Sequence, residues 1–177
     1  MSRRVVITGL GTVNPLGNNV HDFWEGVKEN RLGISKIEQF DTDAIGVSVA
    51  GQVKDFEPTD FIDKKEAKRM ERFTQFAVVA SDEAIKDSGT DFKDIDPYRA
   101  GVIIGCGIGG IGLTLSEYEK FLNKGPNRVS PFYVPMMIGN MAAGQVSMKT
   151  GFKGDNFSTV TACASGTHAI GESDRKS

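Results

Sequence analysis

Cys163 is the residue of this sequence best placed to perform covalent chemistry. It follows a short β-branched run in NFSTVTACASGTHAIG, and the small residues around it permit a tight turn between a strand and a helix. A cysteine at the start of a helix lies at the positive end of the helix dipole, which lowers a thiol pKa and favours the nucleophilic thiolate. Backbone N–H groups there can also stabilise an oxyanion during acyl transfer. An isolated cysteine is more often a small buried hydrophobic residue, so the local pattern leaves both interpretations open.

A catalytic base for Cys163 is not evident in the sequence. His168 lies five residues further on, and at about 100° per residue it would point well away from the cysteine on a helix. We therefore interpret His168 as a packing or hydrogen-bonding residue, and His21 as a solvated residue of a charged helix. The residues on either side of Cys106 do not show whether it is a reactive thiol or a residue of a packed wall.

The glycines after the strand GVIIG match a nucleotide-binding fingerprint. Gly105, Gly107 and Gly110 satisfy G-x-G-x-x-G between a strand and a helix, the setting in which this motif binds a dinucleotide. The acidic residue expected about 20 positions on is missing from NKGPNRVSPF. We favour close backbone packing over cofactor binding. A third interpretation is a thin glycine wall beside a substrate channel, with Ile108 as its apolar lining.

Composition is that of an ordinary globular protein, in which any electrostatic partner site must be local. The 177 residues are 39% hydrophobic and 25% charged, with a net charge of −2, so neither nucleic acid nor membrane is attracted by overall charge. Two cysteines form no disulfide framework and have no zinc-binding spacing, which suggests a reducing, cytoplasmic setting and no metal or cofactor. The apolar run near the N-terminus is too short for a signal peptide.

Hydrophobic periodicity predicts alternating strands and helices. Continuously apolar strands next to helices indicate a layered α/β fold with a mostly parallel sheet, in one domain. Strands are expected at 45–53 (a strand or hairpin), at 156–162, and within 3–13 and 99–110, where each strand runs into a glycine-rich turn. Helices are expected at 18–30, at 63–89 with a break near Phe73, at 113–125, at 136–151 and after Cys163, with a proline-rich loop at 125–135.

Four segments together resemble the β-ketoacyl-[acyl-carrier-protein] synthases, specifically the elongating synthase II type of bacterial fatty acid synthesis. These segments are RRVVITGLGTVNPLG, GVIIGCGIGG, SPFYVPMMIGNMAAG and GFKGDNFSTVTACASGTHAIG, and they cover most of the chain in order. The resemblance implies the N-terminal half of a thiolase-like fold. It also implies that Cys163 accepts an acyl chain and that a decarboxylative condensation with a malonyl group follows.

The same resemblance implies roles for other residues. The backbone N–H of Cys163 would donate to the oxyanion. Gly107, Ile108 and Tyr133 would bind substrate, with Ile108 gating the acyl pocket and Tyr133 near it or reaching in from a dimer partner. Family members are homodimers, so the strand NFSTV is expected to pair near the two-fold axis.

Family members continue into a second half that carries two histidines, a lysine and a second oxyanion donor. This sequence ends in the polar GESDRKS, so we expect a truncated chain without the C-terminal half. The leading hypothesis is an acyltransferase of the condensing class. The alternative is a catalytically inactive fragment that only binds carrier protein or a partner subunit.

A group of basic residues is a candidate surface for an acidic carrier protein. On one long helix, positions i, i+1, i+4, i+5 and i+8 would form a single positive face, although most such runs are only solvated surface. The resemblance implies an acyl carrier protein as partner, which favours docking. The face comprises Lys64, Lys65, Lys68, Arg69 and Arg72; the first choices for carrier binding are Lys65, Lys68 and Arg69, with Arg128 as a second contact.

Overall fold

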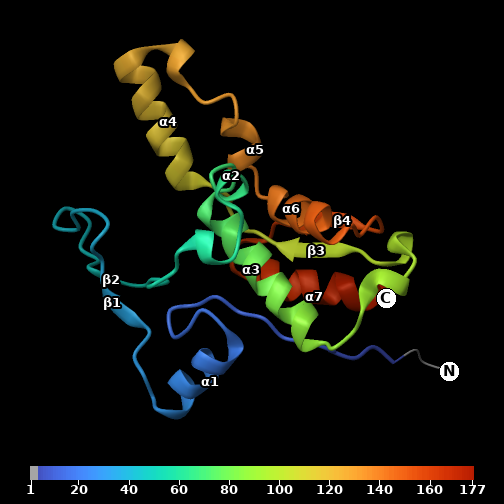
Figure 1. Cartoon of the computed structure of the whole chain (residues 1–177). Helices are drawn as coiled ribbons and strands as arrows, with labels where there is room; N and C mark the ends of the chain where they lie inside the picture. Colours follow the sequence, from blue (N-terminus) through green and yellow to red (C-terminus); the bar gives the residue numbers. More distant parts are fainter. Residues whose placement is uncertain (1–3) are drawn as a thin grey trace. The chain divides into compact units, whose positions relative to one another are not determined.

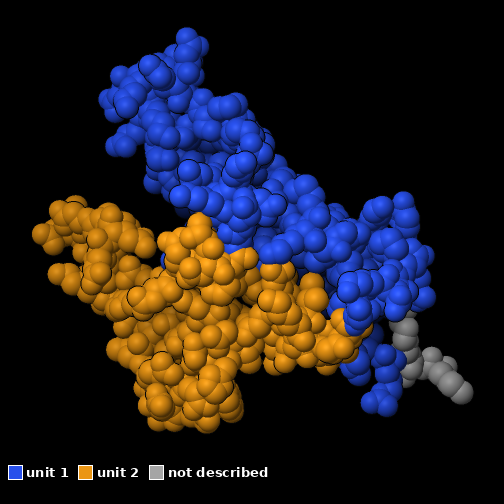
Figure 2. Space-filling model, in the orientation of Figure 1, with its two compact units in different colours: residues 1–6, 62–78, 91–177 blue, residues 7–61, 79–90 orange. Residues whose placement is uncertain are grey.

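The structure is a computed structural model that describes residues 4–177 (Figure 1). It divides into two compact units (Figure 2). Unit 1 comprises Ile62–Val78, Asp91–Ser177 and the described part of Met1–Val6, and unit 2 comprises Ile7–Phe61 and Val79–Thr90. Cys163 belongs to unit 1.

A two-stranded parallel sheet forms the centre of unit 1, as the apolar strands predict. Strand β3 (Val102–Gly105) pairs with β4 (Asn156–Thr159), with Val102 opposite Asn156 and Gly105 opposite Thr159. Helices α6 (Met141–Thr150) and α7 (Ser165–Lys176) both pack on these strands (Figure 1). Together they form the layered arrangement of helices and parallel strands that the sequence predicts.

The two helices cover opposite faces of this sheet. Asn156 donates from its side chain to the carbonyl of Ala143 in α6 at 3.1 Å, whereas Thr159 donates to the carbonyl of Ser165 in α7 at 2.8 Å. Residues three apart on a strand point to opposite faces, so α6 and α7 enclose the sheet. On the α6 side Ala142 and Ala143 are fully buried, because their small side chains allow the helix to approach the strands closely.

Helix α4 and the segment after it also belong to unit 1. Helix α4 (Ile111–Lys124) ends at Gly125, whose φ of +81° favours glycine. The predicted loop contains a 3-10 turn at Pro126–Arg128 and the start of the short helix α5 (Tyr133–Met137). The single helix predicted over 136–151 is wrong, since α5 ends before Ile138 and α6 begins at Met141.

The long helix predicted over 63–89 is interrupted. Helix α2 (Lys64–Ala67) is one turn long and α3 (Arg72–Asp87) begins after a non-helical link. The break lies before Phe73, and the Gln75 side chain satisfies the freed carbonyls of Ala67 and Met70 at 3.0 and 3.2 Å. The positive face predicted on one continuous helix is therefore wrong, because its residues lie on two helices and the link.

Unit 2 is built on a capped helix and a small antiparallel pair of strands. Helix α1 (Val20–Lys28) begins as predicted after Asn19, whose side chain accepts from the N–H of Asp22 at 2.8 Å. Strands β1 (Ile34–Lys36) and β2 (Val49–Gly51) pair antiparallel, which confirms a short strand within 45–53. The remaining elements are 3-10 turns: Pro58–Asp60 in this unit, and Phe92–Asp94, Pro97–Arg99 and Ala162–Ala164 in unit 1.

The strand predicted over 3–13 is wrong for the described residues of that segment, which form no strand. In unit 2 the backbone of this segment bonds to side chains of α3 instead of to another strand. Leu10 N–H, for example, donates to the Asp87 carboxylate at 2.8 Å. A Cβ at Gly11 would lie 1.9 Å from the carbonyl oxygen of Ala80, so only glycine permits this approach.

Large apolar side chains are exposed along one side of α4. They recur at i, i+4, i+7 and i+11, the spacing of one helical face, and comprise Ile111, Leu115, Tyr118 and Leu122. Over residues 4–177, no helix is both long and apolar enough to cross a membrane.

Candidate active site around Cys163

Cys163 lies on an exposed turn between the parallel sheet and a helix. It is the middle residue of the 3-10 turn Ala162–Ala164, which follows β4 and leads directly into α7. The preceding residue, Ala162, has a φ of +50°. A residue with a Cβ in this left-handed region costs about 1 kcal/mol or more. The chain therefore accepts backbone strain in the turn that carries the thiol.

Glycines allow β3 to approach this turn. A Cβ at Gly105 would lie 2.2 Å from the carbonyl oxygen of Ser165, and one at Gly107 would lie 3.3 Å from the carbonyl oxygen of Ala162. Two of the three glycines that match a nucleotide fingerprint therefore lie against the backbone around Cys163, whereas a Cβ at Gly110 would lie 3.2 Å from the Cα of Met137. This contact agrees with the preferred interpretation of close backbone packing.

Cys106 belongs to the packed wall beside this turn. Its N–H donates to the carbonyl of Thr159 at 3.0 Å, which extends the pairing of β3 with β4. A Cβ at Gly139 would lie 3.0 Å from the Cys106 sulfur. Cys106 is partly buried whereas Cys163 is exposed, so the two thiols differ in access.

Ile108 belongs to the glycine turn itself, and Tyr133 begins the helix α5 whose last residue is bonded to that turn. Ile108 is 73% exposed, directly after Gly107. The N–H of Gly110 donates to the carbonyl of Met137 at 2.8 Å, which joins the glycine turn to the end of α5. Tyr133, at the start of α5, donates to the hydroxyl of Thr114 at 3.3 Å. Its ring lines an apolar hollow of about 330 Å³ on α4.

His168 is directed along α7. Its Nε2 lies 3.7 Å from Oε1 of Glu172, one turn further down the helix. This contact runs away from Cys163, which precedes the helix. This distance is too long for a hydrogen bond, so the interpretation of His168 as a packing or hydrogen-bonding residue stays a prediction.

The predicted carrier-binding residues lie on the surface of unit 1. Lys65 and Lys68 are exposed at α2 and its C-terminal end. The guanidinium of Arg69 lies 5.0 Å from the ring centroid of Phe132, a cation–π distance. Phe132 ends the segment that contains Arg128, so Arg69 is packed against that segment.

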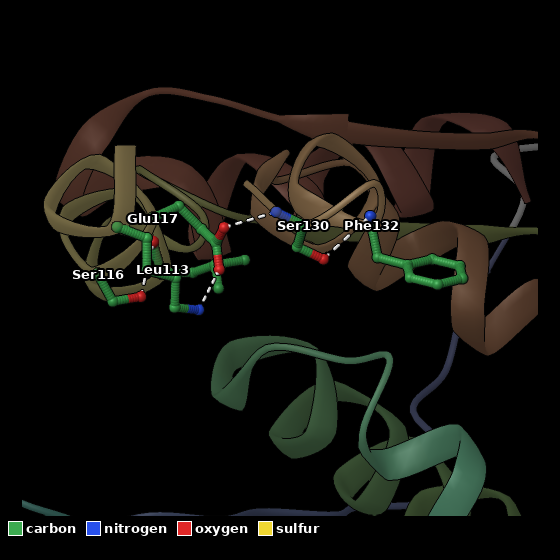
Figure 3. A network of polar contacts seen from close by, with 6 residues as sticks. Leu113, Ser116, Glu117, Ser130 and Phe132 are labelled. Atoms are coloured by element: carbon green, nitrogen blue, oxygen red, sulfur yellow. Dashed lines mark hydrogen bonds and ion pairs between the residues drawn. The ribbon is translucent and has the colours of Figure 1, made fainter. Parts of the chain in front are cut away.

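Glu117 is a functional candidate that the sequence did not single out. It is 3% exposed on α4, and its carboxylate accepts from the N–H of Ser130 at 2.7 Å and from the Lys120 ammonium at 2.5 Å (Figure 3). Ser130 in turn accepts from the N–H of Phe132 at 3.2 Å. The bond from Lys120 and then the bond from Ser130 hold the pKa of Glu117 below its usual value. The carboxylate therefore fixes the segment that carries Arg128 to α4.

We expect Glu117→Gln to destabilise the fold at neutral pH but not in acid. A carboxylate with a lowered pKa stabilises the fold above about pH 4.5, and this contribution is lost as pH falls through the folded-state pKa. Urea unfolding at several pH values should show a difference from wild type at pH 7 that shrinks below about pH 4. Glu119→Gln, at an exposed position of the same helix, is the control. A difference independent of pH would contradict this role.

The fold with this thiol-bearing turn is that of the thiolase-like ketosynthases. The structure superposes on the ishigamide ketosynthase/chain length factor with a TM-score of 0.80 and 28% identity, covering 91% of this chain and 40% of that one. It superposes on a β-ketoacyl synthase from Burkholderia phymatum STM815 with a TM-score of 0.76 and 27% identity, covering 97% and 42%.

Residues 2–176 match the family described as β-ketoacyl synthase, N-terminal domain, and the chain belongs to this family. It is 52% identical over 171 residues to 3-oxoacyl-[acyl-carrier-protein] synthase 2 of Staphylococcus aureus (strain N315), covering 97% of this chain and 41% of that protein. It is 48% identical over 173 residues to the protein of the same name from Synechocystis sp., covering 98% and 42%. The chain thus spans about two fifths of the length of these relatives.

Proposed function

We propose that this chain carries the acyl-accepting nucleophile of a β-ketoacyl-acyl-carrier-protein synthase of fatty acid elongation. The observation that carries the proposal is the exposed Cys163 on a strained turn at the start of α7, in a chain of the β-ketoacyl synthase family. The name shared by the two relatives supports an acyl carrier protein as the source of the substrate. In this proposal the chain is the N-terminal half of the complete enzyme.

The proposed chemistry is a transfer of the acyl group followed by its extension. The Cys163 thiolate attacks the carbonyl carbon of the carrier thioester, and the carrier thiol leaves as the new thioester forms on the enzyme. The backbone N–H of Cys163 donates to the oxyanion of the tetrahedral intermediate. Malonyl-carrier then loses carbon dioxide, and its carbanion displaces Cys163 to give a β-ketoacyl chain two carbons longer. The second step needs the family's histidines and lysine, which belong to the other half.

The substrate-binding assignments to Gly107, Ile108 and Tyr133 are part of the same proposal. The contact of Gly107 with the Ala162 carbonyl and the exposure of Ile108 support an acyl path that begins beside Cys163. The apolar hollow lined by Tyr133 supports an apolar ligand or partner side chain on α4. Substitution of any of these three residues is expected to alter the length of acyl chain that the complete enzyme prefers.

Carrier docking is proposed for Lys65, Lys68, Arg69 and Arg128. The first two are exposed, and the packing of Arg69 on Phe132 supports one continuous basic surface across α2 and the loop of Arg128. A homodimer in the cytoplasm completes the proposal. The exposed apolar side of α4 supports a protein partner, and the two free thiols suit a reducing compartment.

The test is retention of a labelled acyl group by the chain. After incubation with radiolabelled acyl-carrier protein, we expect a protein-bound label that hydroxylamine releases, as it does from a thioester. Cys163→Ala should remove the label and Cys106→Ala should leave it. A chain that binds carrier without retaining any label would support the inactive fragment instead.

A further inference from the structure

The side chain of Ser165 joins the two ends of the Cys163 turn. Its hydroxyl accepts from the N–H of Thr161 at 2.9 Å and donates to the carbonyl of Ala162 at 2.7 Å. Ser165 is only 3% exposed, so water has little opportunity to replace these bonds. One hydroxyl therefore satisfies backbone groups on both residues that precede Cys163.

The backbone of Ser165 is fixed as firmly as its side chain. Its carbonyl accepts from the Thr159 hydroxyl at 2.8 Å in a buried position, and the Thr159 carbonyl accepts from Cys106 N–H at 3.0 Å. Ser165 is thus anchored to the end of the sheet. Because its backbone is fixed, the Ser165 hydroxyl restrains the residues of the turn to which it bonds.

The strained residue of the turn is the one whose carbonyl Ser165 binds. Ala162 has a φ of +50°, a conformation that persists in a residue with a Cβ only when its surroundings impose it. Two groups of Ser165 restrain the Ala162 peptide, because its hydroxyl and its backbone N–H both donate to the Ala162 carbonyl. Loss of the hydroxyl leaves the backbone bond alone and frees the Thr161 N–H, so we expect Ala162 to relax toward an ordinary conformation and Cys163 to turn away from the start of α7.

We infer that Ser165 is a positioning residue for the Cys163 thiol, acting by holding Ala162 in its left-handed conformation. This inference rests on the proposed function, because it takes Cys163 to be the nucleophile. Ser165 touches neither substrate nor the reacting sulfur in this role. It determines how reactive the thiol is by fixing where the turn places it relative to the N-terminus of α7.

The experiment is alkylation of the intact chain by iodoacetamide at pH 7. Rates at Cys163 and Cys106 are followed separately by peptide mass spectrometry. We expect Ser165→Ala to slow alkylation of Cys163 about tenfold, the order expected from release of the strained turn. Ser173→Ala is the matched control, since Ser173 lies on the same helix and its hydroxyl bonds only within the helix, to Ala169 at 2.9 Å.

A second substitution separates positioning from simple loss of packing. Glycine adopts a positive φ without strain, so adding Ala162→Gly to Ser165→Ala should restore most of the lost rate at Cys163. If Ser165→Ala also accelerates alkylation of Cys106, the fold has loosened. Restoration of the Cys163 rate in the double variant then distinguishes loss of positioning from loss of packing. Failure of the double variant to restore the rate at Cys163 overturns the inference, as does an unchanged rate in Ser165→Ala.

If the proposed function itself is wrong, the alkylation experiment gives a different result. In that case Cys163 of the wild-type chain reacts no faster at pH 7 than it does in the urea-unfolded chain, before any substitution is made. If wild-type Cys163 is more reactive and accepts an acyl group while Ser165→Ala behaves as wild type, only the role of Ser165 is lost.

Discussion

Gly105→Ala is expected to destabilise the chain by about 3 kcal/mol, at the upper end of the range for overpacking. The added Cβ would lie 2.2 Å from the carbonyl oxygen of Ser165 and 2.5 Å from the nitrogen of Gly166. Both are backbone atoms of the first turn of α7 and cannot move aside as a flexible side chain could. Helix α7 would have to shift away from β3, and the Cys163 turn would move with it. Urea unfolding measures the loss of stability, and the alkylation rate of Cys163 measures the displacement of the turn.

The matched control for Gly105→Ala is Gly112→Ala. Gly112 lies in α4, and a Cβ there would have no atom within 4 Å. Alanine is favoured over glycine in a helix interior by roughly 0.5–1 kcal/mol, so this variant should be slightly more stable than wild type. Equal stability of the two variants would refute the close approach of β3 to α7.

Lys65→Glu combined with Lys68→Glu is expected to weaken binding of acyl carrier protein at least about tenfold at low salt, since like charges then face each other. Both side chains are exposed on unit 1, so the substitution alters charge without removing core packing. The salt dependence of binding should also fall, because charge attraction across the interface is what salt screens. Titration of carrier protein at two salt concentrations measures both effects.

The control for this charge reversal is Lys36→Glu combined with Lys54→Glu. These two lysines are exposed on unit 2, and the change in net charge is the same. If this pair weakened binding equally, the effect would come from overall charge, and the docking surface would be wrong. Arg69 is left in place because its contact with Phe132 would be lost together with its charge.

Elements with complete local signals are predictable from the sequence. Helix α1 has a capping asparagine and one apolar face, and α4 is followed by a glycine at positive φ. The apolar run of β3 is also found as predicted, in parallel pairing with β4. In each case the residues that define the element lie within it, so the pattern needs no distant partner.

Elements that depend on distant contacts are not predictable in this way. The segment at 3–13 has a strand pattern, but its amides at Leu10 and Thr12 bond to carboxylates of α3 more than 70 residues away. The break between α2 and α3 is satisfied by the side chain of Gln75. The sequence predicts a break near Phe73, but no local pattern identifies the distant bonds that support either arrangement.

The reactive thiol of the candidate site was predictable from the sequence, but the residues that hold its surroundings in place were not. Small residues around Cys163 signal a tight turn, and the exposed turn before α7 is observed. Ser165 counted in the sequence only as one of those small residues, because its role depends on the fold placing its hydroxyl between two backbone groups. Glu117 similarly appears as an ordinary helix residue until Ser130 is brought against it.

The most direct test that Cys163 is the acyl-accepting nucleophile is to identify the peptide that receives the acyl group. Trypsin places the two cysteines on different peptides, residues 154–175 for Cys163 and residues 100–120 for Cys106. After incubation with acyl-carrier protein, we expect the mass of the acyl group to appear on the peptide 154–175 alone. An acyl group on the peptide 100–120, or on neither peptide, would contradict the assignment of Cys163 as the nucleophile.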